Sequence, residues 1–162
     1  MSDGIAQKKT LFEAEKFLIR EASPKEVEAL RKIYREVLFE DPVDNVGKKL
    51  ILVAIDKKTN EVIGGMERAI DVNSGYAQGI GFAVSAKSQS MGVGTNLLKV
   101  MDEELKNIGI KHITTLPSSE ASWKIFKSNG YEYPPAVKAY VDETIKETGK
   151  DKFIKTAMFK EL

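Results

Sequence analysis

A strand, a glycine-rich turn and a helix follow one another between residues 76 and 109, and this unit constrains the fold more than any other part of the chain. Residues 76–84 (YAQGIGFAV) are predicted to form a short strand, and the turn is centred on residues 89–94 (QSMGVG). Gly109 supplies the end of the helix. The apolar side chains of the predicted helix recur at helical spacing: Val93, Leu97, Val100, Met101, Leu105 and Ile108.

The two glycines of the turn define the chemistry that it permits. Gly92 and Gly94 have no Cβ, so a ligand can lie directly against the backbone. The first N–H groups of a helix have no partner within it, and the helix dipole places partial positive charge at the same end. The turn therefore predicts a binding site for an anion, above all a phosphate or pyrophosphate group.

Two common phosphate-binding motifs are excluded. A nucleoside-triphosphate P-loop requires a lysine directly after its second glycine, and Thr95 stands there instead. A dinucleotide-binding fingerprint requires a third glycine, and Val84 and Leu97 occupy that position in the two candidate segments. The turn is therefore neither of these loops.

The turn does fit the pattern Q/R-x-x-G-x-G/A, with Gln89, Gly92 and Gly94 at the fixed positions. This pattern is the pyrophosphate loop of the GNAT superfamily of N-acetyltransferases, which the segment resembles. Such a match arises by chance in about one chain in ten of this length. The preceding residues 84–89 (VSAKSQ) are similar to the family's V-x-P-x-x-Q, with Ala86 in place of the proline.

The other elements are predicted from apolar patterns and turn residues. Ser23, Pro24 and Glu26 are typical of a helix start, as N-cap, first-turn proline and capping-box glutamate. A right-handed crossover is expected to place the strand at 112–116 beside the strand at 76–84. The expected strands are residues 17–20, 49–55, 62–70, 76–84, 112–116 and 153–160, and the expected helices are residues 24–40, 93–108, 118–128 and 137–146.

This order of elements resembles a GNAT domain over roughly residues 15–162, after a leader at residues 1–14. The resemblance extends to the segments Ile19–Ala22, Ser122–Tyr131 and Met158–Leu162. It implies a mixed α+β (α/β) GNAT fold: a central, mostly antiparallel sheet of six to seven strands, flanked by helices and splayed between the fourth and fifth strands. A single domain is expected.

The resemblance also implies a function, which is transfer of the acetyl group of acetyl-CoA (coenzyme A) to a primary amine. The backbone around Gly92 would hold the pyrophosphate, and the strand at 76–84 would pair with the pantetheine arm. The N–H group of Phe82 is the candidate donor to the oxyanion. The implied cofactor-binding residues are Phe82, Ala83, Val84, Gln89, Ser90, Met91, Gly92, Val93, Gly94, Thr95, Ser119, Ser122 and Phe126.

Both proton-transfer positions of the family carry unusual residues here. Gln78 stands where some members have a basic glutamate, and Phe126 stands where many have an acidic tyrosine. Gln78 can orient a water, Glu67 is the substitute candidate for the base, and Tyr131 or Tyr76 for the acid. The alternatives are a solvent-facing Glu67 and half-buried tyrosines with no role in the reaction. Because coenzyme A thiolate is a fair leaving group, an acid is not essential.

The acceptor is the least defined part of the function. The acidic residues Glu36, Glu40, Asp41 and Asp44 lie where the family binds its acceptor, which would suit a cationic amine such as a polyamine, a lysine side chain or a peptide amino terminus. A solvated acidic helix end is the alternative. The unusual residues at positions 78 and 126 support a second hypothesis for the whole chain. In this hypothesis the chain is a non-catalytic module that binds acyl-CoA as a sensor or partner domain.

Composition excludes several other classes. The chain has 25 Lys and Arg residues against 24 Asp and Glu residues, so no global charge indicates nucleic acid or a membrane surface. It has no cysteine, which excludes disulfides, thiolate metal sites and a cysteine acyl-enzyme. No metal site is expected. The polar start and the absence of a long apolar run predict a cytoplasmic protein, and a homodimer is a possibility from the family resemblance.

Overall fold

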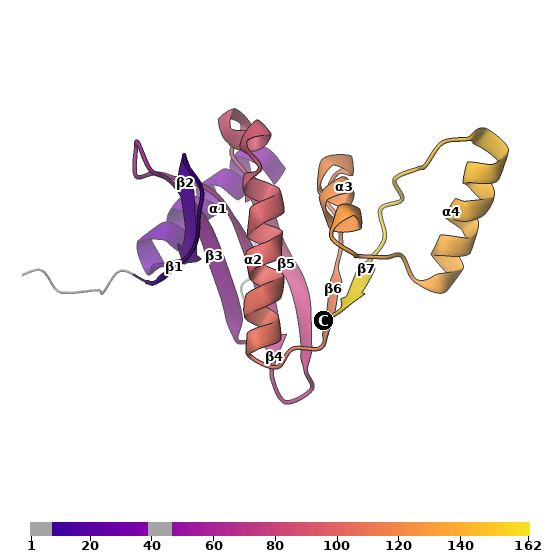
Figure 1. The fold of residues 1–162 in the computed structure, drawn as a ribbon, viewed down its shortest axis with the longest axis horizontal. Helices are drawn as coiled ribbons and strands as arrows, with labels where there is room; N and C mark the ends of the chain where they lie inside the picture. The colour runs from indigo at the N-terminus through magenta and orange to yellow at the C-terminus, as the bar shows by residue number, and fades with distance from the viewer. Residues whose placement is uncertain (1–7, 39–46) are drawn as a thin grey trace, which may run out of the picture.

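The computed structural model describes residues 8–38 and 47–162, which form one sheet with helices on both faces (Figure 1). The strands are β1 (Thr10–Glu13), β2 (Phe17–Glu21), β3 (Lys49–Asp56), β4 (Val62–Asp71), β5 (Tyr76–Val84), β6 (His112–Thr115) and β7 (Met158–Glu161). The helices are α1 (Pro24–Leu38), the short 3₁₀ helix η1 (Ala86–Met91), α2 (Val93–Asn107), α3 (Glu120–Ser128) and α4 (Pro135–Thr148).

The seven strands lie in the sheet in the order in which they occur in the chain. Neighbouring strands are antiparallel except β5 and β6, which are parallel because α2 crosses between them. This is the mixed α+β fold with a mostly antiparallel sheet that the sequence predicts. The strand at 112–116 does lie beside the strand at 76–84.

The strands β5 and β6 pair only at their first three residues and separate beyond them (Figure 1). Their paired residues are Tyr76 with His112, Ala77 with Ile113 and Gln78 with Thr114. In the described part of the chain, the rest of β5, Gly79–Val84, has no strand partner on that side. The predicted splay is confirmed, and it opens one backbone edge of β5 in the middle of the sheet.

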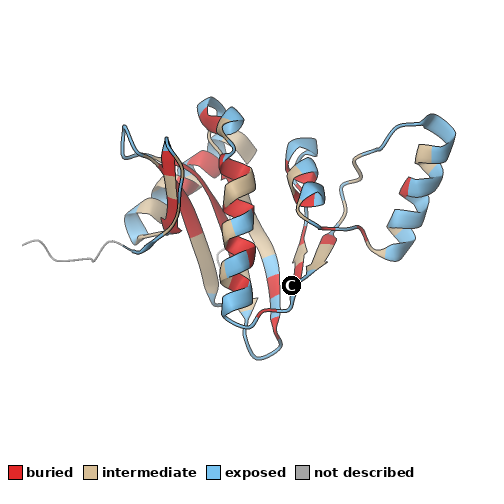
Figure 2. Ribbon diagram, viewed as in Figure 1, coloured by how far each residue is buried: buried red, intermediate tan, exposed pale blue. Residues whose placement is uncertain are grey.

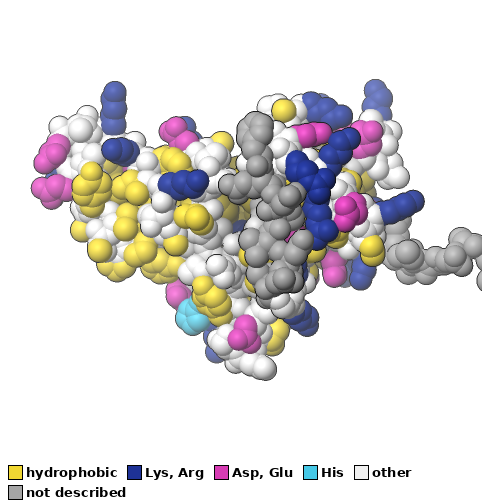
Figure 3. All heavy atoms as spheres, turned by 180° about the vertical axis from the view of Figure 1, so that it is seen from behind, with side chains coloured by type: hydrophobic (Ala, Val, Ile, Leu, Met, Phe, Trp, Pro, Cys, Tyr) yellow, Lys and Arg dark blue, Asp and Glu magenta, His cyan; other side chains and the backbone are white. Residues whose placement is uncertain are grey.

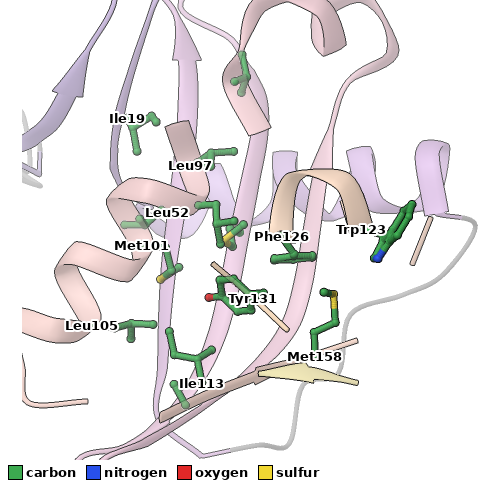
Figure 4. Close-up of a cluster of buried hydrophobic side chains, with 14 of the residues drawn as sticks. Ile19, Leu52, Leu97, Met101, Leu105, Ile113, Trp123, Phe126, Tyr131 and Met158 are labelled. Atoms are coloured by element: carbon green, nitrogen blue, oxygen red, sulfur yellow. The ribbon is translucent and has the colours of Figure 1, made fainter. Parts of the chain in front are cut away.

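Both faces of the sheet are covered. Consecutive residues of β3 alternate between two cores, with Leu52 facing α2 and Val53 facing α1. The buried residues concentrate on the central strands and on the inner sides of these helices (Figure 2). In the larger core, Leu97, Met101 and Leu105 of α2 lie beside Phe126 and Tyr131 (Figure 4).

The start of α1 is fixed by Glu26, as the capping-box pattern predicts. Its carboxylate accepts a hydrogen bond from the Ser23 N–H at 2.9 Å and pairs with the Arg20 guanidinium of β2. Burial acts to raise the pKa of Glu26, but the hydrogen bonds from Arg20 and Ser23 outweigh it and hold the pKa below its usual range. This pair therefore ties the helix to the sheet.

Replacing Glu26 with glutamine is expected to lower the free energy of unfolding at pH 7 by about 1 to 2 kcal/mol. Because the folded-state pKa is depressed, the contribution is present above the unfolded value of about 4.3 and is lost as the pH falls through the folded value. Denaturant unfolding of both proteins from pH 7 downward measures this. A difference that stays constant into acid would contradict the charge-based account.

Two details differ from the expected elements. Thr10–Glu13 forms the edge strand β1, so the sheet begins within the segment expected to be a leader. The last strand begins at Met158 and not at residue 153, because Ile154 exchanges backbone hydrogen bonds with the Tyr133 hydroxyl and Phe153 packs on Trp123. The expected end of α1 near residue 40 lies outside the described residues. In the described part of the chain, no helix is long and apolar enough to cross a membrane.

Candidate active site

A cavity of about 750 Å³ lies where β5 and β6 separate. A second cavity of about 130 Å³ adjoins it and shares Phe82, Gln89 and Ser119 with it. The larger cavity is lined by Val37, Leu38, Arg68, Gln78, Gly79, Ile80, Gly81, Phe82, Gln89, Thr115, Leu116, Ser118, Ser119, Ala121, Ser122, Phe126 and Lys155. Together the two cavities run from Gly94 at the start of α2 to the point at which β5 and β6 meet.

The backbone of β5 presents hydrogen-bonding groups to this cavity. The Ser85 N–H donates to the Ile63 carbonyl of β4 at 2.8 Å. Because successive N–H groups of a strand point to opposite edges, those of Val84 and Phe82 point toward the cavity. The Gln89 side chain donates to the Val84 carbonyl at 3.2 Å, which ties η1 to the end of the strand. Ala83 has its backbone turned toward β4 and lines only the smaller cavity.

The start of α2 has the open geometry that an anion requires. Gly92 adopts a left-handed conformation with φ of +78° and serves as N-cap without a side-chain hydrogen bond. Its carbonyl accepts the first helical bond, from the Asn96 N–H at 3.1 Å, so the N–H groups of Val93, Gly94 and Thr95 precede the helical ladder. The first turn has no acidic residue. Ser90 and Met91 end η1 beside this turn.

Close packing explains the second glycine of the loop. A Cβ at Gly94 would lie 3.1 Å from the Phe82 ring and 3.1 Å from Ile125. The start of α2 therefore sits directly against β5 and α3, at the mouth of the smaller cavity.

The two serines of α3 line the cavity and also cap the helix. The Ser119 hydroxyl accepts from the Ser122 N–H at 3.1 Å, and the Ser122 hydroxyl accepts from the Ser119 N–H at 3.1 Å. Phe126, two turns further along the helix, packs edge-on against the Phe82 ring with 5.6 Å between centroids. These residues form the wall opposite β5.

The candidate base is buried and does not line the cavity. Glu67 is 0% exposed, and neither carboxylate oxygen has a hydrogen-bond partner within the described residues. The nearest cation is Lys49, whose Nζ is 3.8 Å from Oε1. The alternative of a solvent-facing Glu67 is therefore wrong, because α1 covers this face of the sheet.

Tyr34 of α1 lies between Glu67 and the cavity. Burial, with the charge of Glu67 second, raises the pKa of Tyr34 well above its ordinary value. A Cβ at Gly81 would lie 2.6 Å from the Tyr34 hydroxyl, and Gly81 lines the cavity. Glycine at this position leaves room for the hydroxyl directly behind the cavity wall, although Tyr34 itself is 1% exposed and is not among the residues that line the cavity.

The tyrosines considered as the acid are engaged elsewhere. Tyr131 is 2% exposed, is not among the residues that line the cavity, and donates to the Asp102 carboxylate at 2.7 Å. Burial raises its pKa, with Asp102 adding to this shift and Arg68 opposing it. Tyr76 is hydrogen-bonded to Thr114. Tyr131 is therefore a packed core residue in this structure, and not the half-buried aromatic of the alternative.

Of the acidic residues expected near an acceptor, the described part of the chain contains only Glu36, which is exposed on α1; Glu40, Asp41 and Asp44 lie outside it. Basic side chains gather over the face that carries α1 (Figure 3). Within the described residues, no group of three or more His, Cys, Asp or Glu side chains could hold a metal ion.

Two cations of the cavity were not singled out from the sequence. Arg68 lines its deep end and Lys155 its rim. The adjacent charged residues Glu67 and Arg68, inside the otherwise apolar first part of β4 and opposite the glycine-rich β5, are the signal that could have indicated Arg68.

The sequence profile of the acetyltransferase (GNAT) family matches residues 15–131. The chain belongs to this family. The matched residues of this GNAT protein include the loop at Gly92, the whole of β5 and all of α3. No curated protein sequence matches the chain.

Solved structures of the same fold agree with this assignment. A GCN5-related N-acetyltransferase from Kribbella flavida is similar with a TM-score of 0.64 and 16% identity, over 91% of this chain and 99% of the other. Tetrahymena GCN5 is similar with a TM-score of 0.60 and 23% identity, over 85% and 86%. An N-acetylglutamate synthase from Neisseria gonorrhoeae was solved with coenzyme A and N-acetyl-glutamate. It is similar with a TM-score of 0.63 and 14% identity, over 93% of this chain and 36% of the other.

Proposed function

We propose that this GNAT protein is an N-acetyltransferase that moves the acetyl group of acetyl-CoA to a primary amine. The observation that carries the proposal is the combination of a helix start at Gly92 without a side-chain cap and a β5 backbone edge without a strand partner, which two adjoining cavities connect. The first feature suits a pyrophosphate and the second suits an extended amide chain, and acetyl-CoA contains both in that order.

The residues present fit this ligand. The N–H groups of Val93, Gly94 and Thr95 would hold the pyrophosphate, with no acidic side chain in the first turn to repel it. The N–H groups of Phe82 and Val84 would pair with the pantetheine amides as a neighbouring strand would. When bound, acetyl-CoA supplies an activated thioester, from which an amine can displace the thiolate.

The chain contributes electrostatic stabilisation at the reacting carbonyl. Addition of an amine to the acetyl carbonyl would place negative charge on the carbonyl oxygen, and this charge would then return as the carbon–sulfur bond breaks and the electron pair leaves on sulfur. The Phe82 N–H, held by the pairing of β4 with β5, would donate a hydrogen bond to this oxygen. This role needs no particular side chain.

The amine must also lose a proton. Gln78 lines the cavity and can orient a water, while the Tyr34 hydroxyl packs behind the cavity wall at Gly81. Burial raises the pKa of Tyr34, so its hydroxyl stays protonated and could pass a proton to Glu67 while it accepts another. Among the described residues neither the hydroxyl nor the carboxylate has a hydrogen-bond partner, so this path requires Tyr34 to move into hydrogen-bond distance of Glu67 during the reaction. Glu67 is thus the final acceptor in this proposal, and it acts through Tyr34.

A second candidate function is a non-catalytic module that binds acyl-CoA. Gln78 in place of a glutamate and Phe126 in place of a tyrosine favour it, because neither side chain transfers protons. The two candidates share the coenzyme A site and differ in turnover.

The proposal predicts that acetyl-CoA binds with micromolar or tighter affinity and that an amine makes it release free thiol. Calorimetric titration with acetyl-CoA measures the first. Thiol release against a panel of amino acids, polyamines, aminoglycosides and peptides measures the second. Binding without any amine-dependent release would favour the module, and absence of binding would overturn both candidates.

A further inference from the structure

Arg68 is a buried cation at the deep end of the cavity, where β5 and β6 meet. Its side chain is 1% exposed. Nη1 donates to the Glu67 carbonyl at 3.1 Å, and Nε and Nη2 have no hydrogen-bond partner within the described residues. An unpaired guanidinium is costly to bury, so this arrangement calls for an anionic partner.

The neighbouring carboxylates do not supply that partner. Asp102 accepts from the Tyr131 hydroxyl at 2.7 Å and pairs with Lys160 Nζ at 3.0 Å. The Glu67 carboxylate has Lys49 as its nearest cation, at 3.8 Å. In the described part of the chain, no carboxylate lies within ion-pair distance of the Arg68 guanidinium.

The Arg68 guanidinium and the Thr115 hydroxyl both lie against Gly79, which lines the cavity. A Cβ at Gly79 would lie 3.1 Å from Arg68 Nη1 and 2.3 Å from Thr115 Oγ1. The Phe126 ring covers the other side, 5.8 Å from the guanidinium carbon. Glycine at position 79 therefore lets Arg68 and Thr115 pack directly against the backbone of β5, and all three residues line the cavity. We call this polar end of the cavity the niche.

The charged side chains that line the cavity are positive, as Arg68 itself is. Its charged lining residues, among those described, are Arg68 and Lys155, and no described Asp or Glu side chain lines it. The niche at Gly79 lies three residues before Phe82 on β5, which is about 10 Å along a strand. It is therefore beyond the proposed acetyl position, on the side away from the pyrophosphate loop.

We infer that Arg68 binds a carboxylate of the acceptor, so that the acceptor is an amino acid or a similarly short amine that carries a carboxylate. The free Nε and Nη2 form one edge of the guanidinium, and this fork matches the two oxygens of a carboxylate. The coenzyme A thiolate, the other anion in the reaction, would present only one acceptor atom to the guanidinium. The inference rests on the proposed acetyltransferase function for the identity of the site.

Nuclear magnetic resonance tests the contact without turnover. In ¹⁵N-labelled protein saturated with coenzyme A, the Nε–H resonance of Arg68 is assigned by its disappearance in Arg68→Lys. Glycine, glutamate and γ-aminobutyrate are expected to shift this resonance in a saturable manner, while the matched carboxamides do not. No movement with any carboxylate, or equal movement with the carboxamides, would overturn the inference.

Kinetics tests the consequence for substrate choice. The wild-type protein is expected to use the amino acid over its carboxamide by about 10- to 100-fold in kcat/KM. In Arg68→Met the ratio is expected to fall to within about threefold of one, while Arg68→Lys keeps part of it because the charge remains without the fork. Lys155→Met, which removes the exposed cation of the same cavity, serves as the matched control and is expected to keep the ratio.

The outcomes separate this inference from the proposed function. Equal use of amines with and without a carboxylate would overturn the inference and leave the acetyltransferase standing. Carboxylate binding at Arg68 with no thiol release from any acceptor would support the niche and overturn the enzyme. Calorimetric binding of coenzyme A by Arg68→Met shows that the variant is folded and that a lost preference is specific.

Discussion

Replacing Gly92 with valine is expected to weaken acetyl-CoA binding by about 100-fold or more. The reason is the loss of about two of the charge-assisted hydrogen bonds that the first N–H groups of α2 would donate to the pyrophosphate. Gly92 has φ of +78°, which a side chain adopts at a cost of about 1 to 2 kcal/mol. The start of α2 must therefore shift, and the N–H groups of Val93, Gly94 and Thr95 move with it. Calorimetric titration with acetyl-CoA measures the loss.

Gly109→Val is the matched control. Gly109 lies just past the other end of α2, also has a positive φ of +93°, and like Gly92 has no tight contact in the direction of a Cβ. The substitution should cost similar stability without touching the proposed site. Equal weakening in both variants would mean that the helix as a whole, and not its first turn, is what acetyl-CoA requires.

Replacing Tyr34 with phenylalanine is expected to lower kcat by about 100-fold, within the usual contribution of general base catalysis. The hydroxyl is 2.6 Å from where a Gly81 Cβ would lie, and in the proposed proton path it links the cavity to Glu67. Glu67→Gln should give a similar loss, and the double variant should be no slower than either single one, because both act on one path. Thiol release with the fastest acceptor of the panel measures all three.

Tyr131→Phe is the control for removal of a buried tyrosine hydroxyl. Tyr131 is as buried as Tyr34 but belongs to the core on the α2 face, where its hydroxyl is bonded to Asp102. Its loss should reduce stability by about 1 to 3 kcal/mol, since Asp102 loses a partner, and leave kcat nearly unchanged. A large fall in kcat here, with none in Tyr34→Phe, would move the proton path to the opposite face.

The parts of the fold that local patterns specify were predictable. The loop at Gly92, the helix after it and the antiparallel strands β3 and β4 depend on neighbours in the sequence. The splay was inferred from the family resemblance, and the structure confirms it at Gln78. The final strand was predicted too long, because the Tyr133 hydroxyl holds Ile154 outside the ladder and no local pattern encodes that contact.

It was harder to predict on which face of the sheet each residue of the candidate site lies. Met66, Glu67 and Arg68 are all buried, because helices cover both faces of the sheet and alternation then no longer separates core from solvent. A register shift between Glu67 and Arg68 adds to this. The placement of Arg68 in the cavity, and of Tyr34 against Gly81, depends on contacts between distant segments. A cytoplasmic location and a homodimer stay predictions.

Transfer of label is the most direct test of the central claim. Acetyl-CoA labelled with ¹³C in the acetyl carbonyl is incubated with the protein and the amine panel, and the products are followed by mass spectrometry and carbon resonance. The account predicts that the label moves to the nitrogen of at least one acceptor as an amide, with one free thiol released for each amide formed. Label recovered only as acetyl-CoA or free acetate, with the cofactor bound, would contradict it.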